Sequence, residues 1–245
     1  DFSAFVFKIQ ANMNKAHRDR IAFMRVVSGR FDADREVYHV QGGKKIKLSR
    51  PQQLMAAERE IIEEAYAGDI IGVFDPGIFS IGDTLCAPGK KFRFDPIPTF
   101  APEHFRRVRP LDTMKRKQFL KGMEQIAQEG AIQIFKTPYT GMEEVIVGVV
   151  GTLQFDVLEY RLKNEYGVEL YMEGLPYEYL RWIENDTGEP IKEEQLILGT
   201  DVKLVEDYKG NQLLLFASQW SIHWVQDKNK DLTLTEFGGA RDSQG

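Results

Sequence analysis

Apolar and polar residues alternate along the first hundred residues. The clearest case is residues 21–28, where side chains of the two kinds alternate until a Ser-Gly pair ends the run. Period-two alternation is typical of strands with one buried face. The same pattern predicts strands over residues 5–11, 36–40, 45–49, 69–74 and 83–85, with a Gly-Gly hairpin turn at 42–43. We therefore expect an antiparallel β-barrel in this part of the chain.

Residues 54–66 do not follow this alternation. They consist largely of strong helix formers, so propensity alone predicts a helix. The segment also holds four glutamates, Glu58, Glu60, Glu63 and Glu64, which invite interpretation as an acid–base pair. No His, Lys or metal-ligand pattern lies nearby, so a solvent-exposed face is the better interpretation.

Strands and helices alternate in the second part of the chain. The pattern predicts a strand over 105–109, a helix over 112–129, strands over 131–135 and 145–150, a helix over 152–166 and a strand over 168–172. Gly130 and Gly167 follow the two helices, where glycine commonly ends a helix. The order is that of a ferredoxin-like unit. We expect the second helix to face its core with Leu153, Val157, Leu158 and Leu162.

Five prolines between residues 88 and 110 separate the two parts. Because proline neither donates to a sheet nor continues a helix, we place a domain boundary near Phe100. This gives a β-barrel over residues 1–100 and an α+β domain over residues 101–245. The latter divides into a ferredoxin-like part (101–174), a second α+β part (175–237) and a tail (238–245). In the second part we expect strands near 179–183, 202–205 and 213–216, and a short helix over 220–225.

Charge is unevenly distributed in this chain of 245 residues, whose formal net charge is −5. Residues 13–50 hold ten basic residues against four acidic ones, and residues 101–125 hold seven against three. A protein that touches nucleic acid locally can have this distribution without being basic overall. The chain has no apolar run of about 18 residues, so we expect no membrane span. Its single cysteine, Cys86, excludes an internal disulfide and fits a core position and a cytoplasmic location.

Known catalytic motifs are missing from the sequence. It contains neither the Gly-x4-Gly-Lys-Ser/Thr phosphate loop nor the Asn-Lys-x-Asp guanine motif of GTPases, and no Gly-x-Ser-x-Gly elbow. The four histidines have no ligand spacing for zinc. We therefore assign no catalytic, cofactor-binding or metal-ligating residues. Tyr177, Tyr179 and Trp182 allow a base-stacking platform, but core or sheet-face positions are the better interpretation.

Several longer sequence segments are similar to those of a known family. They are FVFKIQANM at 5–13, HRDRIAFMRV at 17–26, AGDIIGV at 67–73, IGDTL at 81–85 and GVVGTLQFDV at 148–157. In this order they resemble translational GTPases, and most closely the class II peptide chain release factors, over residues 1–166. The resemblance implies a domain II barrel, with extended chain through 54–66. It also implies a fragment without its GTP-binding domain, where GTP and magnesium would bind.

The resemblance also implies a function for the basic residues. The whole factor would promote dissociation of class I release factors from the ribosome. The barrel would contact small-subunit ribosomal RNA, because Lys and Arg on loops of a rigid scaffold suit contacts to phosphates. The α+β domain would contact a ribosomal protein and the GTP-binding domain, and neither membrane nor DNA is implied. The candidate RNA-contacting residues are Lys15, His17, Arg18, Arg20, Lys44, Lys45 and Lys47.

Two alternatives stay open at this point. The first is another translational GTPase, of the elongation or ribosome-protection type, which would share the barrel. The phrase at residues 148–157 argues against it. The second is a stand-alone α+β hydrolase or ligand-binding protein that uses carboxylates such as Asp156 and Glu159.

Overall fold

A computed structural model describes residues 1–11, 20–55, 58–90, 92–95, 101–138, 145–185 and 187–236. Its contacts divide the chain into two compact units. The first consists mainly of residues 1–97, and the second of residues 98–238 apart from 128–130. Phe100, where the boundary was predicted, and the predicted tail lie outside the described residues.

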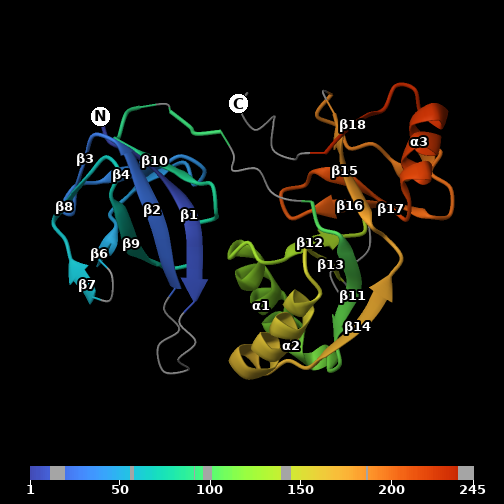
Figure 1. Ribbon diagram of the computed structural model, residues 1–245, viewed down its shortest axis with the longest axis horizontal. Helices are drawn as coiled ribbons and strands as arrows, with labels where there is room; N and C mark the ends of the chain where they lie inside the picture. The colour runs from blue at the N-terminus through green and yellow to red at the C-terminus, as the bar shows by residue number, and fades with distance from the viewer. Residues whose placement is uncertain are drawn as a thin grey trace. The chain divides into compact units, whose positions relative to one another are not determined.

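The first unit is built on a curled antiparallel sheet (Figure 1). In the described residues its order is β5-β4-β10-β1-β2-β9-β6-β7, and β3 pairs separately with β8. The strands are β1 (Ser3–Ala11), β2 (Arg20–Ser28), β3 (Arg30–Asp32), β4 (Val37–His39), β5 (Lys44–Ile46), β6 (Ser49–Met55), β7 (Glu58–Ile61), β8 (Glu64–Tyr66), β9 (Ile70–Asp75) and β10 (Thr84–Cys86). The alternating pattern therefore predicted β1, β2, β4, β5, β9, β10 and the 42–43 turn, and it missed β3, β6, β7 and β8.

The helix that propensity predicted over residues 54–66 is wrong, and the extended chain implied by the resemblance is confirmed. β6 pairs with β9 and with β7, while β8 pairs with β3. Within β8, Ala65 is buried in the core and its neighbours Glu64 and Tyr66 are exposed, which is strand alternation. β3 and β9 are distant in sequence from this segment, so the hydrogen bonds to them override the local helix preference.

Two turns of the first unit have the same internal hydrogen bonds. The Asp69 carboxylate accepts from the backbone N–H of Tyr66 at 2.9 Å, and the Asp69 N–H donates to the Tyr66 carbonyl at 2.9 Å. The Asp83 carboxylate and N–H make the same two bonds with Ser80, at 2.9 and 3.1 Å. Each aspartate therefore closes its turn with a reciprocal pair of bonds.

The same two turns attach to neighbouring strands in the same way. Gly68 and Gly82 have φ angles of +96° and +93°, a region that favours glycine. The Gly68 N–H donates to the Val26 carbonyl of β2, and the Gly82 N–H donates to the Val6 carbonyl of β1, both at 2.7 Å. Val26 and Val6 are fully buried, so each Gly-Asp turn is bonded directly to a core strand.

The second unit begins with the predicted ferredoxin-like arrangement (Figure 1). Its elements are β11 (His104–Pro110), α1 (Arg116–Gln128), β12 (Gln133–Lys136), β13 (Val145–Val149), α2 (Leu153–Tyr166) and β14 (Leu170–Leu175). A short 3-10 turn, η1 (Thr113–Lys115), capped by Asp112, precedes α1. The strands are all antiparallel in the order β14-β11-β13-β12, which confirms the predicted topology.

Helices α1 and α2 pack on one face of these strands (Figure 1). Gly122 lies in the middle of α1, where a Cβ atom would approach the Leu162 side chain to 2.9 Å and the Tyr166 ring to 3.0 Å. The Tyr166 hydroxyl also donates to the Gln125 side chain across the same contact. A glycine in a helix interior makes the helix about 1 kcal/mol less stable than an alanine would. Here it allows the two helices to approach closely.

Of the four residues predicted to form the buried face of α2, two are buried and two are exposed. Leu158 and Leu162 are fully buried together with Phe155, but Leu153 is 69% exposed and Val157 is 41% exposed. At 100° per residue, Leu153 and Val157 lie on nearly the opposite side of the helix from Phe155 and Leu162. The helix therefore has apolar side chains on two faces, and only one of them is buried.

Residues 175–236 extend the same sheet. They form β15 (Tyr179–Glu184), η2 (Glu193–Gln195), β16 (Val202–Asp207), β17 (Gln212–Phe216), α3 (Gln219–Lys228) and β18 (Thr233–Thr235). The full order is β14-β11-β13-β12-β16-β17-β15-β18 in the described residues. A flat sheet would place β14 and β15 roughly 29 Å apart, whereas the three residues that join them reach only about 14 Å. The sheet must therefore curl.

The buried apolar side chains of the second unit form three layers, separated by the curled sheet. Helices α1 and α2 cover one layer, and α3 covers another on the far side of β16 and β17. The middle layer joins Phe105, Phe135 and Ile146 of the ferredoxin-like strands to Leu180 and Trp182 of β15. Tyr177 packs against this middle layer and Tyr179 packs against the α3 layer. The aromatics therefore have core and sheet-face positions, as the better interpretation predicted.

Replacing Gly122 by valine tests the close approach of α1 and α2. We expect Gly122→Val to lower the free energy of unfolding by about 1–3 kcal/mol, because the new side chain overfills the contact. Urea denaturation of the second unit measures this. Gly174→Val is the matched control, since a Cβ there meets nothing within 4 Å, and its effect should stay within about 0.5 kcal/mol. Equal losses for the two variants would contradict the packing role of Gly122.

Candidate functional site

Three exposed lysines lie within four residues on the β4–β5 hairpin of the first unit. Lys44 and Lys45 belong to β5, opposite His39 and Tyr38 of β4, and Lys47 follows directly. Within the described residues, none of the three lysines forms an ion pair. Among the strands that the structure describes, β5 lies at the edge of its sheet, so the hairpin presents its positive charge at that edge.

A buried histidine, His39 of β4, connects this hairpin to the core of the first unit. His39 is 2% exposed, and its Nε2 lies 2.7 Å from the Asp83 carboxylate, which is 6% exposed. The imidazole ring also packs edge-on against Phe79, with ring centroids 5.1 Å apart. Asp83 belongs to one of the two Gly-Asp turns, so the hairpin is joined to that turn through a buried hydrogen bond.

The turn of the hairpin lies directly over the histidine ring. A Cβ atom at Gly42 would come within 2.4 Å of the His39 Nδ1, so only glycine fits there without movement. Next to it, the Gln41 side-chain carbonyl accepts from the Thr84 N–H at 2.8 Å. Backbone and side chains therefore fix the lysine hairpin to β10 at several points.

The other predicted RNA-contacting residues are placed differently. Lys15, His17 and Arg18 lie outside the described residues. Arg20 was expected in a loop, but it is the first residue of β2, opposite Ala11 and Asp75. It is 6% exposed, so its side chain is not part of the open surface. Of the four predicted residues that the structure describes, it brings together the three lysines of the hairpin and places Arg20 apart from them.

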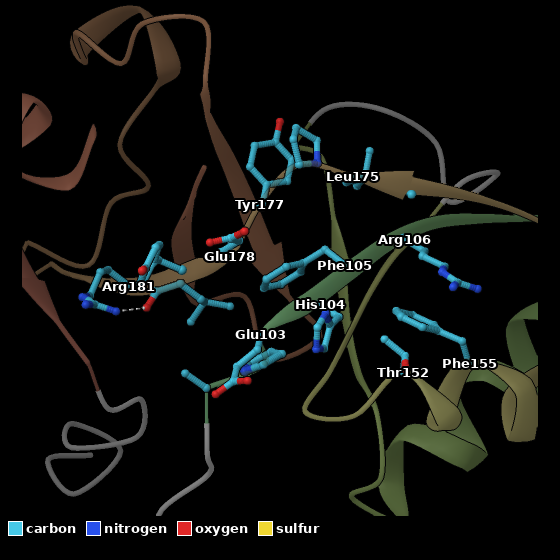
Figure 2. Close-up of a pocket in the computed structure, with 16 residues that line it drawn as sticks. Glu103, His104, Phe105, Arg106, Thr152, Phe155, Leu175, Tyr177, Glu178 and Arg181 are labelled. Carbon is cyan, nitrogen blue, oxygen red and sulfur yellow. Dashed lines mark hydrogen bonds between the residues drawn. The ribbon is translucent and has the colours of Figure 1, made fainter. Parts of the chain in front are cut away.

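The second unit contains a pocket of about 600 Å³ (Figure 2). It is lined by the start of β11, the first turn of α2 and the connection from β14 to β15. In Figure 2, His104 and Tyr177 lie on opposite sides of Phe105. Burial raises the pKa of Tyr177 above its usual value, against a smaller opposing effect of Arg107.

Arg106 and Phe155 line one side of this pocket and contact each other. The Arg106 guanidinium carbon lies 4.3 Å from the centroid of the Phe155 ring, a distance typical of a cation–π interaction. Asp156 and Glu159, the carboxylates of the hydrolase alternative, are exposed on α2 and do not line the pocket. The arrangement gives that alternative no support.

Neither the pocket nor the buried contact of His39 with Asp83 was predicted from the sequence. Both are built from residues far apart in the chain: His39 and Asp83 are 44 residues apart, and the pocket combines three separate segments. Neither leaves a local pattern. The Ile-Gly-Asp phrase at 81–83 was a usable signal for the turn, but nothing in it pointed to a histidine partner.

In the described residues, no group of three or more His, Cys, Asp or Glu could hold a metal ion, and no helix is long and apolar enough to cross a membrane.

Comparisons with known proteins divide the chain in the same way. A family model described as "Elongation factor G domain 2" matches residues 1–88, and one described as "Class II release factor RF3, C-terminal domain" matches residues 94–226. A crystal structure of a protein from Thermus thermophilus covers 77% of this chain with a TM-score of 0.53 and 18% identity, which supports the fold alone. This chain covers 29% of that protein.

Curated relatives match almost the whole chain. Peptide chain release factor 3 of Symbiobacterium thermophilum is 54% identical over 98% of this chain, and that of Gloeobacter violaceus is 46% identical over 97%. The chain spans 44% of the length of each. Together, the two family models define a translation factor in which a domain 2 barrel is joined to a release-factor C-terminal domain. The chain belongs to the peptide chain release factor 3 family.

The buried His39–Asp83 pair allows a comparison between the two Gly-Asp turns. We expect Asp83→Ala to lower the free energy of unfolding by about 2–4 kcal/mol, because it also leaves buried polar atoms of His39 without a partner. Asp69→Ala removes the equivalent turn bond at a more exposed position and should cost about 1 kcal/mol. Urea denaturation of both variants measures the difference. Equal losses would show that the histidine pair adds nothing.

Proposed function

We propose that the whole protein is a GTP-dependent release factor of translation termination that promotes dissociation of class I release factors from the ribosome. GTP and magnesium would bind in a domain that this chain lacks. The chain itself would supply ribosome contacts and no catalysis. The GTP form would bind a rotated ribosome better than the unrotated one, and this difference in affinity would shift the ribosome toward the rotated state and weaken binding of the class I factor. The protein would act in the cytoplasm.

The observation that carries this proposal is the match of residues 94–226 to the class II release factor model. The barrel alone would fit an elongation-type or ribosome-protection factor equally well, since its own match is to an elongation factor domain. The C-terminal match covers more than half of the chain and separates the two possibilities. It favours termination over elongation.

Within this function, the lysine hairpin is the proposed contact to small-subunit ribosomal RNA. Lys44, Lys45 and Lys47 are exposed and lack ion-pair partners in the described part of the chain. The buried His39–Asp83 pair fixes their hairpin to the core. Lysines on a fixed support suit phosphate contacts, which position a protein without reading sequence. Lys15, His17 and Arg18 are proposed to extend this contact.

Lysines on an edge strand also have a purely structural use. Natural sheets place charged residues, lysine above all, on edge strands to prevent pairing with other molecules. That role predicts aggregation when the lysines are lost, while RNA contact predicts weaker binding with a changed salt dependence. The two roles therefore differ in what the same variant does.

The test is a triple variant, Lys44→Glu, Lys45→Glu and Lys47→Glu, in the full-length protein with a non-hydrolysable GTP analogue. Co-sedimentation with ribosomes at several salt concentrations should show weaker binding. The plot of log K against log salt has a negative slope, and this slope should become less steep by roughly 2–3, since each lost phosphate contact removes nearly one unit. We expect the variant to show no more aggregation than the unaltered protein.

The matched control makes the same charge change elsewhere. Lys192, Lys228 and Lys230 are exposed lysines of the second unit, and their replacement by glutamate should leave the slope nearly unchanged. If the hairpin variant bound like the control and aggregated instead, the lysines would be edge protection. If the unaltered protein did not bind ribosomes at all, the proposed function itself would be wrong.

A further inference from the structure

The side chains that line the pocket of the second unit are separated by charge. In Figure 2, Arg106, Phe155 and Thr152 lie on one side of His104, whereas both glutamates that line the pocket lie on the other side. We call Arg106, Thr152 and Phe155 the Arg106 end of the pocket. This end combines a positive charge, a hydroxyl and an aromatic ring.

Arg106 holds its charge at a defined place. Its guanidinium carbon lies 4.3 Å from the centroid of the Phe155 ring, which is 1% exposed. In the part of the chain that the structure describes, Arg106 forms no ion pair, whereas its neighbour Arg107 pairs with Glu173 at 3.1 Å. A guanidinium carries five N–H donors in its plane, and stacking on a ring leaves the donors at its edge free. The Arg106 end therefore has donors that no carboxylate of the described chain neutralises.

A glycine keeps the space beside Arg106 open. Arg106 of β11 lies opposite Gly174 of β14 in the sheet register, so the two residues share one face. A Cβ atom at Gly174 would meet nothing within 4 Å, and its φ angle is not in the left-handed region. Backbone conformation therefore does not require glycine at this position. The Thr152 hydroxyl at the same end caps no backbone N–H of α2, so it is available to a ligand.

The volume and the remaining lining define the size and the body of a ligand. The pocket measures about 600 Å³, within the range of about 300–1,000 Å³ that proteins use for small molecules. Phe105, Leu175 and Tyr177 supply aromatic and aliphatic surface. Glu103 and Glu178 at the other end repel a second negative group, which excludes a polyanion such as a nucleic-acid strand. The pocket therefore fits a small molecule with an apolar body and one anionic end.

We propose that this pocket binds a small organic anion, either a phosphate ester or a carboxylate. The anionic group lies on Arg106 and Thr152, and the apolar part lies against Phe105 and Tyr177. A guanidinium pairs with either kind of group through two parallel hydrogen bonds. The assignment does not depend on the proposed ribosome contact, because the pocket belongs to the second unit and the lysine hairpin to the first. Binding there would stabilise the folded state of the second unit.

Phenyl phosphate and benzoate are the probes, because each joins an aromatic ring to one of the two anionic groups. Each is titrated into the isotope-labelled 245-residue chain, and binding is followed by the NMR shifts of backbone amides. We expect a Kd in about the millimolar range for at least one probe, since ligands of so few atoms bind weakly. The shifts should concentrate at residues 103–106 and 152–155. Benzyl alcohol, which is neutral, should bind at least roughly tenfold more weakly.

Two variants separate a ligand site from a purely structural stack of Arg106 on Phe155. Arg106→Gln removes the charge, and Gly174→Val fills the space beside it, so each should weaken probe binding at least roughly tenfold. Gly174→Val should leave the free energy of unfolding nearly unchanged, so its loss of binding would not reflect unfolding. Arg109→Gln is the matched control. Arg109 stacks on Tyr171 at 4.5 Å outside the pocket, and its loss should leave binding unchanged.

Each outcome of the titrations decides the proposal. Binding of phenyl phosphate alone would identify a phosphate ester as the ligand class, and binding of benzoate alone would identify a carboxylate. Absence of binding by both probes, or equal binding of benzyl alcohol, would overturn the proposal. Unchanged affinity in Arg106→Gln and Gly174→Val would also overturn it, because the anion would then bind elsewhere and the stack on Phe155 would serve packing alone.

Discussion

The two Gly-Asp turns are the constraint on which the first unit depends. In each turn the aspartate bonds reciprocally to the residue three positions before it, and the glycine N–H bonds to a buried strand. A turn with both sets of bonds has little freedom to change register. Because one turn is attached to β1 and the other to β2, together they fix the central pair of strands. The lysine hairpin gains its position from the second of these turns, through His39 and Asp83.

Elements with a strong local signal could be predicted from the sequence. Period-two alternation located β1, β2, β4, β5, β9 and β10 of the first unit, and glycines after apolar stripes located the ends of α1 and α2. Residues 54–66 could not be predicted from propensity, because their strands depend on β3 and β9, which are distant in the chain. The orientation of α2 failed for a different reason. With apolar residues on both sides of the helix, spacing alone does not say which side is buried.

The candidate site was predictable only in part. The lysines of the hairpin were found because a Gly-Gly turn and a basic run are both visible in sequence. Arg20 was misplaced because the beginning of β2 is set by pairing with Ala11 and Asp75, and not by residues within the strand. His39 was considered only as a metal ligand, since its partner Asp83 is brought to it by the fold. Groups that meet across a sheet leave no trace in local spacing.

The curled sheet of the second unit has a consequence for how this region unfolds. Its middle apolar layer takes Phe105, Phe135 and Ile146 from the ferredoxin-like strands, and takes Leu180, Leu213 and Leu215 from the strands that follow. Neither set can be exposed without losing the partner that buries it. Residues 101–174 and 175–236, which look separable in sequence, therefore share an apolar layer, and we expect them to unfold together. A chain cut after β14 would expose one side of this layer and lose its native state, however complete its own topology.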